Sequence, residues 1–321
     1  MGAPFDGRQF RNQDPTATRG VRDVLRMLFT RRPARWPAHV PNTATPSQPA
    51  ALADGELAVT FINHATLLVQ SSAGAWITDP VFAERASPVQ WAGPRRVRAP
   101  GMALDDLPPL SFVLLSHNHY DHLDLASLRA IQARDGAPIV TTLGNRAYLR
   151  ARGLEAVEEL DWWDACAPVP GAHVTLTPAQ HFSARTPFDR NRTLWGGFVV
   201  RTAAGAVYFA GDTGYGTFFS EIRDRLGAPD LAFLPIGAYA PRWFMGPLHM
   251  DPADAVRAHL DLGAGRSVAM HFGCFQLTDE GFDAPVAALA EARAAATVDS
   301  DAFRVLAVGE TWRTRLDAGG R

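Results

Sequence analysis

Four potential metal ligands occur within six residues of this chain, directly after an apolar stretch. Phe112-Val-Leu-Leu-Ser116 has the length and composition of a buried strand and runs into His117-x-His119-x-Asp121-His122. Imidazoles and carboxylates packed so closely in a buried loop would repel one another or lack partners unless a cation lay between them. This ligand chemistry suits zinc and similar divalent ions. The segment therefore predicts a metal site at the end of a strand.

Three more potential ligands follow three other apolar stretches. His181 comes after 174–178, Asp212 after 207–211, and His271 after 268–270. Side chains at strand ends can be aimed into one cleft by a rigid scaffold, provided that the strands lie side by side. A single histidine is more often structural, but seven ligand-type residues in this arrangement predict one shared metal centre.

Short apolar runs alternate with helical stretches from Leu57 onward. We expect strands at 57–70 and 75–79, which form a hairpin or meander, and at 112–116, 139–142, 174–178, 197–201, 207–210 and 267–270. We expect helices at 123–134, 145–152, 252–262 and 282–296, and Asp124 is suited to cap the first of these. This order of elements indicates two sheets with helices packed outside them.

The spacing His-x-His-x-Asp-His, with a later His, Asp and His, resembles the metallo-β-lactamase superfamily. The resemblance implies an α+β protein, a four-layer αβ/βα sandwich with two divalent metal ions, taken to be Zn²⁺, at one edge of the sheets. It assigns His117, His119 and His181 to one ion. It assigns Asp121, His122 and His271 to the other ion, with Asp212 bridging the two.

Longer motifs resemble, within that superfamily, the N-acylphosphatidylethanolamine-hydrolysing phospholipase D family. The resemblance covers roughly residues 57–312, and its N-terminal departure leaves residues 1–56 without a match. The motifs are Thr78-Asp-Pro80, Arg85-Ala-Ser-Pro88, 116–124, Glu159-Leu-Asp-Trp-Trp163, 209–215, Pro235-Ile-Gly-Ala-Tyr239, Pro241-Arg-Trp-Phe-Met245, His249-x-Asp-Pro252 and Met270-His271.

This resemblance implies a phosphodiesterase of the phospholipase D type, which releases phosphatidate and an N-acylethanolamine from a phospholipid. Asp121 and Asp212 would act in catalysis as metal ligands, and His249 would protonate the poor alkoxide leaving group. The alternative for His249 is a surface histidine beside a helix. His64 and Asp79 are candidates for orienting the ligand imidazoles or for purely structural roles. Trp243, Phe244 and Met245 would either pack in the core or form the wall of an acyl-chain groove.

Three other functions stay open at this point. A soluble hydrolase of a small phosphorylated or lactone substrate, resembling ascorbate-6-phosphate lactonases, would need a small polar pocket. A nuclease is disfavoured by the acidic body, so no nucleic-acid partner is expected. A catalytically silent membrane-binding module conflicts with the complete ligand set. A homodimer is also left open.

Composition and the absence of a long apolar run indicate where in the cell we expect the protein to be. Hydrophobic residues make up 47% of the 321 residues, and no apolar run approaches the roughly 20 residues that span a bilayer. The first ten residues contain no apolar core of a secretion signal, and two cysteines, Cys166 and Cys274, make no disulfide framework. We therefore expect a cytoplasmic protein, with contact to the inner face of the membrane left open.

The N-terminal segment differs in charge from the rest of the chain. All 31 basic residues are arginine, and residues 1–37 hold eight of them against three aspartates. This segment therefore carries +5, and the rest about −7 of the net charge of −2. Apolar residues between Val21 and Phe29 recur with helical spacing. We expect residues 1–56 to be a basic amphipathic arm and linker, packed on the body or lying on a membrane, before a catalytic domain at 57–321.

Overall fold

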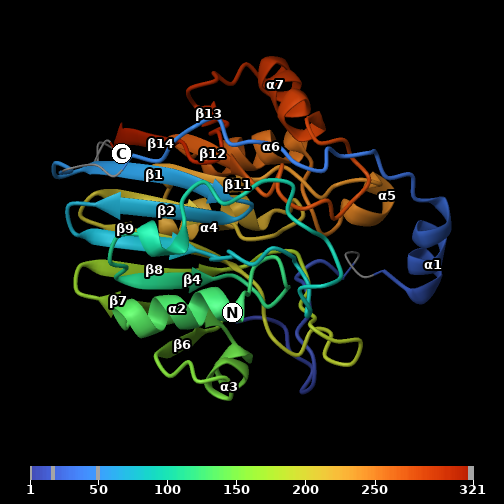
Figure 1. Ribbon diagram of the computed structural model, residues 1–321, viewed down its shortest axis with the longest axis horizontal. Coiled ribbons are helices and arrows are strands. Elements are labelled where there is room, and N and C mark those ends of the chain that lie inside the picture. The colour runs from blue at the N-terminus through green and yellow to red at the C-terminus, as the bar shows by residue number, and fades with distance from the viewer. Residues whose placement is uncertain (1, 16–18, 48–50, 317–321) are drawn as a thin grey trace.

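The computed structural model describes residues 2–15, 19–47 and 51–316, which form two seven-stranded sheets with helices on their outer faces (Figure 1). The first sheet has the strand order β14 (Thr311–Arg315), β1 (Glu56–Asn63), β2 (Thr66–Ser71), β3 (Gly74–Thr78), β4 (Phe112–Leu115), β5 (Ile139–Thr142), β6 (Val157–Leu160). The second has the order β13 (Phe303–Arg304), β12 (Arg266–Met270), β11 (Leu231–Pro235), β10 (Gly205–Phe209), β9 (Gly197–Thr202), β8 (Ala172–Thr177), β7 (Ala165–Val169).

The alternation of side chains along each strand creates two apolar layers around the first sheet. On β4, Phe112 and Leu114 belong to the main core between the sheets, whereas Val113 and Leu115 pack in a second cluster with Leu128 of a covering helix. Successive side chains of a strand point to opposite faces, so a strand that is apolar throughout is buried on both. The expected four-layer αβ/βα sandwich is confirmed.

Helices cover both outer faces, and a few lie away from the sheets. The first sheet carries α2 (Leu125–Asp135) and α3 (Asn145–Arg150), and the second carries α4 (Phe218–Leu226), α6 (Pro252–Leu262) and α7 (Ala284–Ala296). The others are α1 (Val21–Thr30), the 3₁₀ helix η2 (Leu104–Asp106) and the short α5 (Arg242–Met245). Within the described ranges, no helix is long and apolar enough to cross a bilayer.

Local sequence explains where the two best-defined helices begin and end. The Asp124 side chain accepts a hydrogen bond from the Ala126 amide at the start of α2, as expected, and α2 ends at Gly136 in the left-handed conformation. Helix α6 begins after Asp251, which caps it, with Pro252 in its first turn. The predicted bounds of α6 and β5 agree with the structure residue for residue.

Several elements were not predicted from the sequence. They are strands β6, β7, β11, β13 and β14, helices α4 and α5, and the 3₁₀ helix η2. β11 is the instructive case, because all five of its residues are buried and it lies between β10 and β12 in parallel. A short apolar run shows no period from which its structure could be assigned. β11 nevertheless matters for the site, because it separates β10 and β12, the strands that lead to Asp212 and His271.

Candidate metal centre

All seven predicted metal ligands lie together at one end of the sandwich. Residues 117–122 follow β4 of the first sheet, and His181, Asp212 and His271 follow β8, β10 and β12 of the second. The loops after these strands therefore meet across the two sheets. Every ligand side chain is buried except those of His119 and Asp121, which are partly exposed.

Three imidazoles form the first half of the centre. The ring nitrogens Nε2 of His117 and Nδ1 of His119 are 2.8 Å apart, and Nε2 of His181 is 3.2 Å from the same Nδ1. Burial lowers the pKa of His117 and His181 well below the ordinary value and that of His119 to about 4. Three neutral rings with converging lone pairs make a tridentate nitrogen site of the kind that holds a divalent ion.

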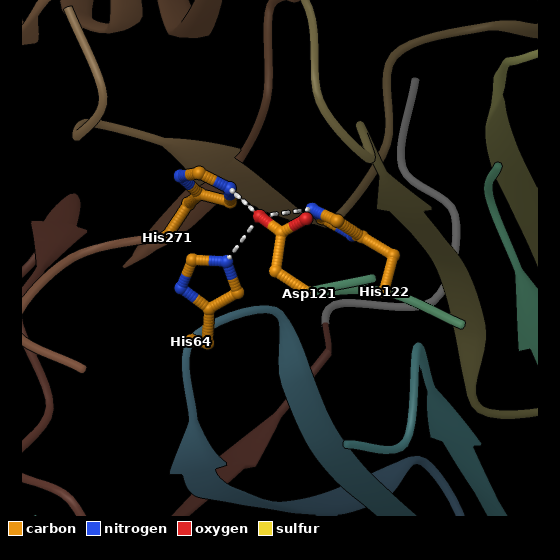
Figure 2. Close-up of side chains that lie close together, drawn as sticks. All are labelled: His64, Asp121, His122 and His271. Atoms are coloured by element: carbon orange, nitrogen blue, oxygen red, sulfur yellow. Dashed lines mark hydrogen bonds and ion pairs between the residues drawn. The ribbon is translucent and has the colours of Figure 1, made fainter. Parts of the chain in front are cut away.

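A second half gathers around the carboxylate of Asp121, as Figure 2 shows. Oδ2 of Asp121 lies 3.0 Å from Nε2 of His64 and 3.5 Å from Nε2 of both His122 and His271. His122 comes from the loop after β4, whereas His64 lies between β1 and β2. The sequence assigned His64 only an orienting or structural role, and the structure brings it into direct contact with a predicted ligand.

Asp212 lies between the two halves. Its Oδ2 is 3.2 Å from Nε2 of His122 and 3.8 Å from Nε2 of His181, and its Oδ1 is 3.0 Å from Nε2 of His271. One carboxylate thus reaches imidazoles of both groups. This is the position that a bridging ligand requires.

The second half of the centre is charged, whereas the three imidazoles of the first half are neutral. Burial alone would lower the pKa of His122 and His271, but the nearby carboxylates, Asp212 foremost, raise that of His271 to about 9 and that of His122 well above the ordinary value. Burial alone would raise the pKa of Asp121 and Asp212, but the neighbouring imidazoles hold both well below their usual range. Without a metal, imidazolium protons therefore balance the two carboxylates.

Buried side-chain atoms that make no hydrogen bond indicate whether the seven predicted ligands fit metal ions. Nε2 of His122, Nε2 of His271 and Oδ1 of Asp212 are buried but make no hydrogen bond, although they lie 3.0 to 3.2 Å from oppositely charged groups. Close approach without hydrogen-bond alignment leaves each atom unsatisfied within the protein. A cation between them would satisfy all three atoms. The residues present therefore fit divalent metal ions.

Further polar contacts hold the ligand rings in place. Oδ2 of Asp79 lies 2.6 Å from Nδ1 of His122, while both carboxylate oxygens of Asp79 accept hydrogen bonds from Ser116. Nδ1 of His181 lies 3.0 Å from the carbonyl oxygen of Leu248. Each contact fixes the nitrogen that carries the proton and turns the other nitrogen toward the centre. Asp79 is thus an orienting residue, one of the two roles that its sequence position left open.

Two supporting residues escaped the sequence analysis. Asn12, far away in the chain, accepts a hydrogen bond from the His181 amide at 3.0 Å and donates one to the His181 carbonyl at 2.9 Å. Arg185 donates to the carbonyl oxygens of Asn118 and Leu123, and its guanidinium stacks on Tyr120 at 3.9 Å. Neither residue belongs to a motif, because each acts on backbone atoms of segments that only the fold brings near.

An apolar pocket of about 330 Å³ opens onto the centre. Asp121, Asp212 and His119 of the centre belong to its lining. Its walls are mainly apolar, and the larger of these side chains are Val24, Phe182, Phe244, Met245, Leu248 and Leu277. Two cations, Arg19 and Arg190, also line the pocket. Phe244 and Met245 thus line a pocket, and Trp243 beside them is 37% exposed.

His249 also lines the pocket, at its inner end. Its Nδ1 lies 3.9 Å from Oδ2 of Asp212, its ring packs edge-on against His181 at 4.9 Å, and Nδ1 has no hydrogen-bond partner among the described residues. Burial lowers its pKa to about 4. A buried position on the pocket wall replaces the alternative of a surface histidine. His259, by contrast, lies 2.8 Å from the Ser267 hydroxyl, away from the pocket lining.

Comparison with known proteins agrees with this geometry. The family described as "Beta-lactamase superfamily domain" matches residues 75–272. A Caenorhabditis elegans protein named N-acyl-phosphatidylethanolamine-hydrolyzing phospholipase D 1 is 38% identical over 80% of this chain and 75% of its own length. A mitochondrial protein of the same name from Saccharomyces cerevisiae is 34% identical over 65% of this chain and 46% of its own length.

Solved structures resemble the fold. An isothiocyanate hydrolase from Delia radicum gut bacteria superposes with a TM-score of 0.65 and 24% identity, over 81% of this chain and 99% of that one. At this identity the likeness extends to the fold alone. The arrangement of two sheets and their helices is therefore common to both proteins.

Proposed function

This chain belongs to the β-lactamase superfamily of metal-dependent hydrolases, and from that premise we propose that it is a phospholipase D-type phosphodiesterase. Its substrate would be an N-acylphosphatidylethanolamine-like phospholipid, cleaved to phosphatidate and an N-acylethanolamine. The observation that carries the proposal is the mainly apolar pocket whose lining includes Asp121 and Asp212 of the metal centre. The names of the worm and yeast relatives support the same substrate class.

We propose that His117, His119 and His181 hold one ion, that Asp121, His122 and His271 hold the other, and that Asp212 bridges them. Imidazole with carboxylate is a donor set that zinc accepts readily, so we take the metal to be Zn²⁺. When bound, a pair of divalent ions supplies Lewis acidity and generates a nucleophile from water near neutral pH.

The pocket offers complementary surfaces for the two parts of a phospholipid. Phe182, Phe244 and Leu248 provide apolar contact for acyl chains, at about 25 cal/mol for each Å² removed from water. Arg19 and Arg190 provide positive charge for the phosphodiester or a neighbouring anionic headgroup. A small polar substrate would use neither the apolar wall nor the length of the pocket.

His249 is the proposed proton donor. Hydrolysis adds water at phosphorus, breaks the bond to the ethanolamine oxygen and leaves an alkoxide that must take up one proton. The charge of a bound phosphodiester favours the imidazolium form and would raise the lowered pKa of His249 toward neutrality. The His249 amide donates to Met245, and its carbonyl accepts from Arg242, which fixes the backbone beneath the ring.

The leaving group distinguishes this role from a structural one. Replacing His249 with Gln should slow hydrolysis of the lipid by about 10²- to 10⁴-fold, the usual contribution of a general acid. A substrate with a nitrophenolate leaving group needs no proton and should be hydrolysed at nearly the original rate. Equal losses on both substrates would remove His249 from this role.

The substrate is tested by turnover of N-acylphosphatidylethanolamine in mixed micelles with the zinc-loaded protein, with products identified by mass spectrometry. Phosphatidate and N-acylethanolamine in equal amounts, both absent with the Asp212→Asn variant, would support the proposal. That variant should stay folded and lose metal. Turnover of a small phosphorylated or lactone substrate without any lipid product would refute the phospholipid proposal in favour of the small-substrate hydrolase. We further propose that the protein acts at the inner face of the membrane; whether it is a homodimer is decided by sedimentation velocity.

A further inference from the structure

Helix α1 presents its apolar side chains to solvent. Phe29 is 87% exposed, Leu28 53%, Leu25 48% and Val24 38%. An amphipathic helix of a globular protein normally turns such a face toward the core. In Figure 1, α1 lies at the right-hand edge of the molecule next to α5, outside the layers of the sandwich. A large part of the apolar face of α1 is therefore left uncovered by the described chain.

Polar and cationic groups hold α1 in this orientation. Just before the helix, Arg19 donates to the carbonyl oxygens of Trp243 at 2.9 Å and Phe244 at 3.3 Å. The Arg26 guanidinium lies 4.5 Å from the centre of the Trp243 ring. At the other end, the Arg31 side chain and the Arg32 amide both donate to the Asp279 carboxylate. These anchors bind the polar side of α1 to the body and leave its apolar side facing out.

The exposed face is continuous with the mouth of the pocket. Val24 of α1 and Arg19 before it belong to the pocket lining, together with Phe244 and Met245 of α5. Leu25, Leu28 and Phe29 continue outward from Val24 but do not line the pocket. A surface that covered these three side chains would therefore lie against the entrance to the metal centre.

The charge around this face selects among possible occupants. Arg22, Arg26, Arg31, Arg32 and Arg35 are exposed on or just after α1. Apolar side chains flanked by arginines are the combination that lies in the interface of an anionic bilayer. A second copy of the chain fits less well, because a two-fold contact would bring both groups of arginines together. At ten residues α1 is about 15 Å long, half the thickness of a bilayer core, so it could lie in the interface but not cross it.

We propose that α1 docks this protein on the surface of a bilayer that contains anionic phospholipids, with Leu25, Leu28 and Phe29 inserted and the pocket mouth held against the lipid. The purpose of this docking rests on the proposed function, because a phospholipid substrate must leave the bilayer to reach the metal centre. The test of docking does not rest on that function, because docking needs no turnover.

The test measures binding of the full-length, metal-loaded protein to sedimented vesicles without N-acylated lipid. One set contains phosphatidylcholine alone, and the other contains phosphatidylcholine with phosphatidylglycerol. The variant replaces Leu25, Leu28 and Phe29 with Ser, and the matched control is Leu260→Ser, which removes a 51% exposed leucine from α6. Metal content and circular dichroism establish that each variant is folded.

We expect the wild type to bind the anionic vesicles more tightly. The triple variant should bind about a thousandfold more weakly or worse, since each of the three inserted side chains contributes about tenfold or more. Leu260→Ser should bind like the wild type. Replacing Arg22 with Gln should weaken binding about fivefold on anionic vesicles only. Hydrolysis of a water-soluble phosphodiester should stay unchanged in the triple variant.

Either of two results with the triple variant would overturn the proposal. One is equal vesicle binding by the triple variant and the wild type. The other is a dimer that the triple variant separates into monomers without loss of vesicle binding, which would make this face a protein interface. Docking without any lipid hydrolysis would refute the proposed function and leave this inference standing. Lipid hydrolysis in micelles, with no vesicle binding by the wild type, would refute this inference and leave the proposed function standing.

Discussion

Replacing Asp79 with Asn should empty the second half of the metal centre while leaving the fold intact. Asp79 is fully buried, and its Oδ2 lies 2.6 Å from Nδ1 of His122. Oδ1 accepts from the Ser116 amide at 2.7 Å. In the Asn variant, the amide oxygen can keep the Ser116 contact, so the amino group must face His122. Nδ1 of His122 would then have to accept a hydrogen bond, which moves the ring proton to Nε2.

The move of the ring proton to Nε2 of His122 determines how much metal affinity the variant loses. Nε2 of His122 is the atom that points to Asp121 and Asp212, and a protonated nitrogen cannot bind a metal. Mutation of such an orienting partner typically weakens metal binding by about 10- to 100-fold, or roughly 1.4 to 2.7 kcal/mol. Loss of a hydrogen bond that involves a charged group destabilises the fold by a further 1.5 to 3 kcal/mol or so. A typical fold is stable by about 5 to 15 kcal/mol and stays folded after such a loss, so metal loss in the variant should exceed any loss of folded protein.

The assay is metal content after dialysis against graded concentrations of a chelator, read by mass spectrometry of the metal. We expect Asp79→Asn to retain one ion per chain where the wild type retains two. Asp124→Asn is the matched control, because Asp124 accepts hydrogen bonds from Ala83, Ala126 and Ser127 but has no contact with a ligand. Two tightly held ions in the Asp79 variant, or equal metal loss in both variants, would refute the reasoning.

Three other predictions concern the protonation of the centre and two further polar residues, Asn12 and Glu280. Metal binding to the second half should release protons, because His122 and His271 have raised pKa values. Apparent metal affinity should therefore rise with pH through about 9, the pKa of His271. Calorimetry in buffers of different ionisation enthalpy that finds no released proton would contradict this. Asn12→Ala should cost about 1 to 3 kcal/mol of stability in urea unfolding, since both backbone groups of His181 lose their partner. Glu280→Gln should destabilise the fold by a similar 1 to 3 kcal/mol or so, because the carboxylate accepts from the Ala238 and Ala240 amides and from the Thr278 hydroxyl; an unchanged urea midpoint would refute either of these.

The clustering of the seven predicted ligands could be predicted from sequence because strand ends and ligand chemistry are local. Residues 117–122 are recognisable because four potential ligands lie within six residues. His181, Asp212 and His271 each follow an apolar run that forms a strand in the structure. The prediction needed only that these strands end at one edge. Asp79 and His64 also follow apolar runs, but the sequence did not show which nitrogen or carboxylate each of them meets.

Residues that act on backbone atoms were beyond this approach. Asn12 reaches the His181 backbone across 169 positions of the chain, and no spacing encodes such a contact. The same limit applies to β14, which pairs with β1 from the opposite end of the described chain. Both contacts depend on how separate segments pack, and packing leaves little trace in local composition.

Helix α1 shows how one pattern is compatible with opposite arrangements. The spacing of its apolar residues predicted a helix, and the helix is there. The same spacing fits an arm packed on the body and an arm that faces a membrane, because amphipathicity defines a face and not its direction. The direction is set by Arg19 and Arg26, which bind α5 through carbonyl oxygens and the Trp243 ring. Since these contacts involve the polar side of α1, they leave Leu25, Leu28 and Phe29 to a surface outside the protein.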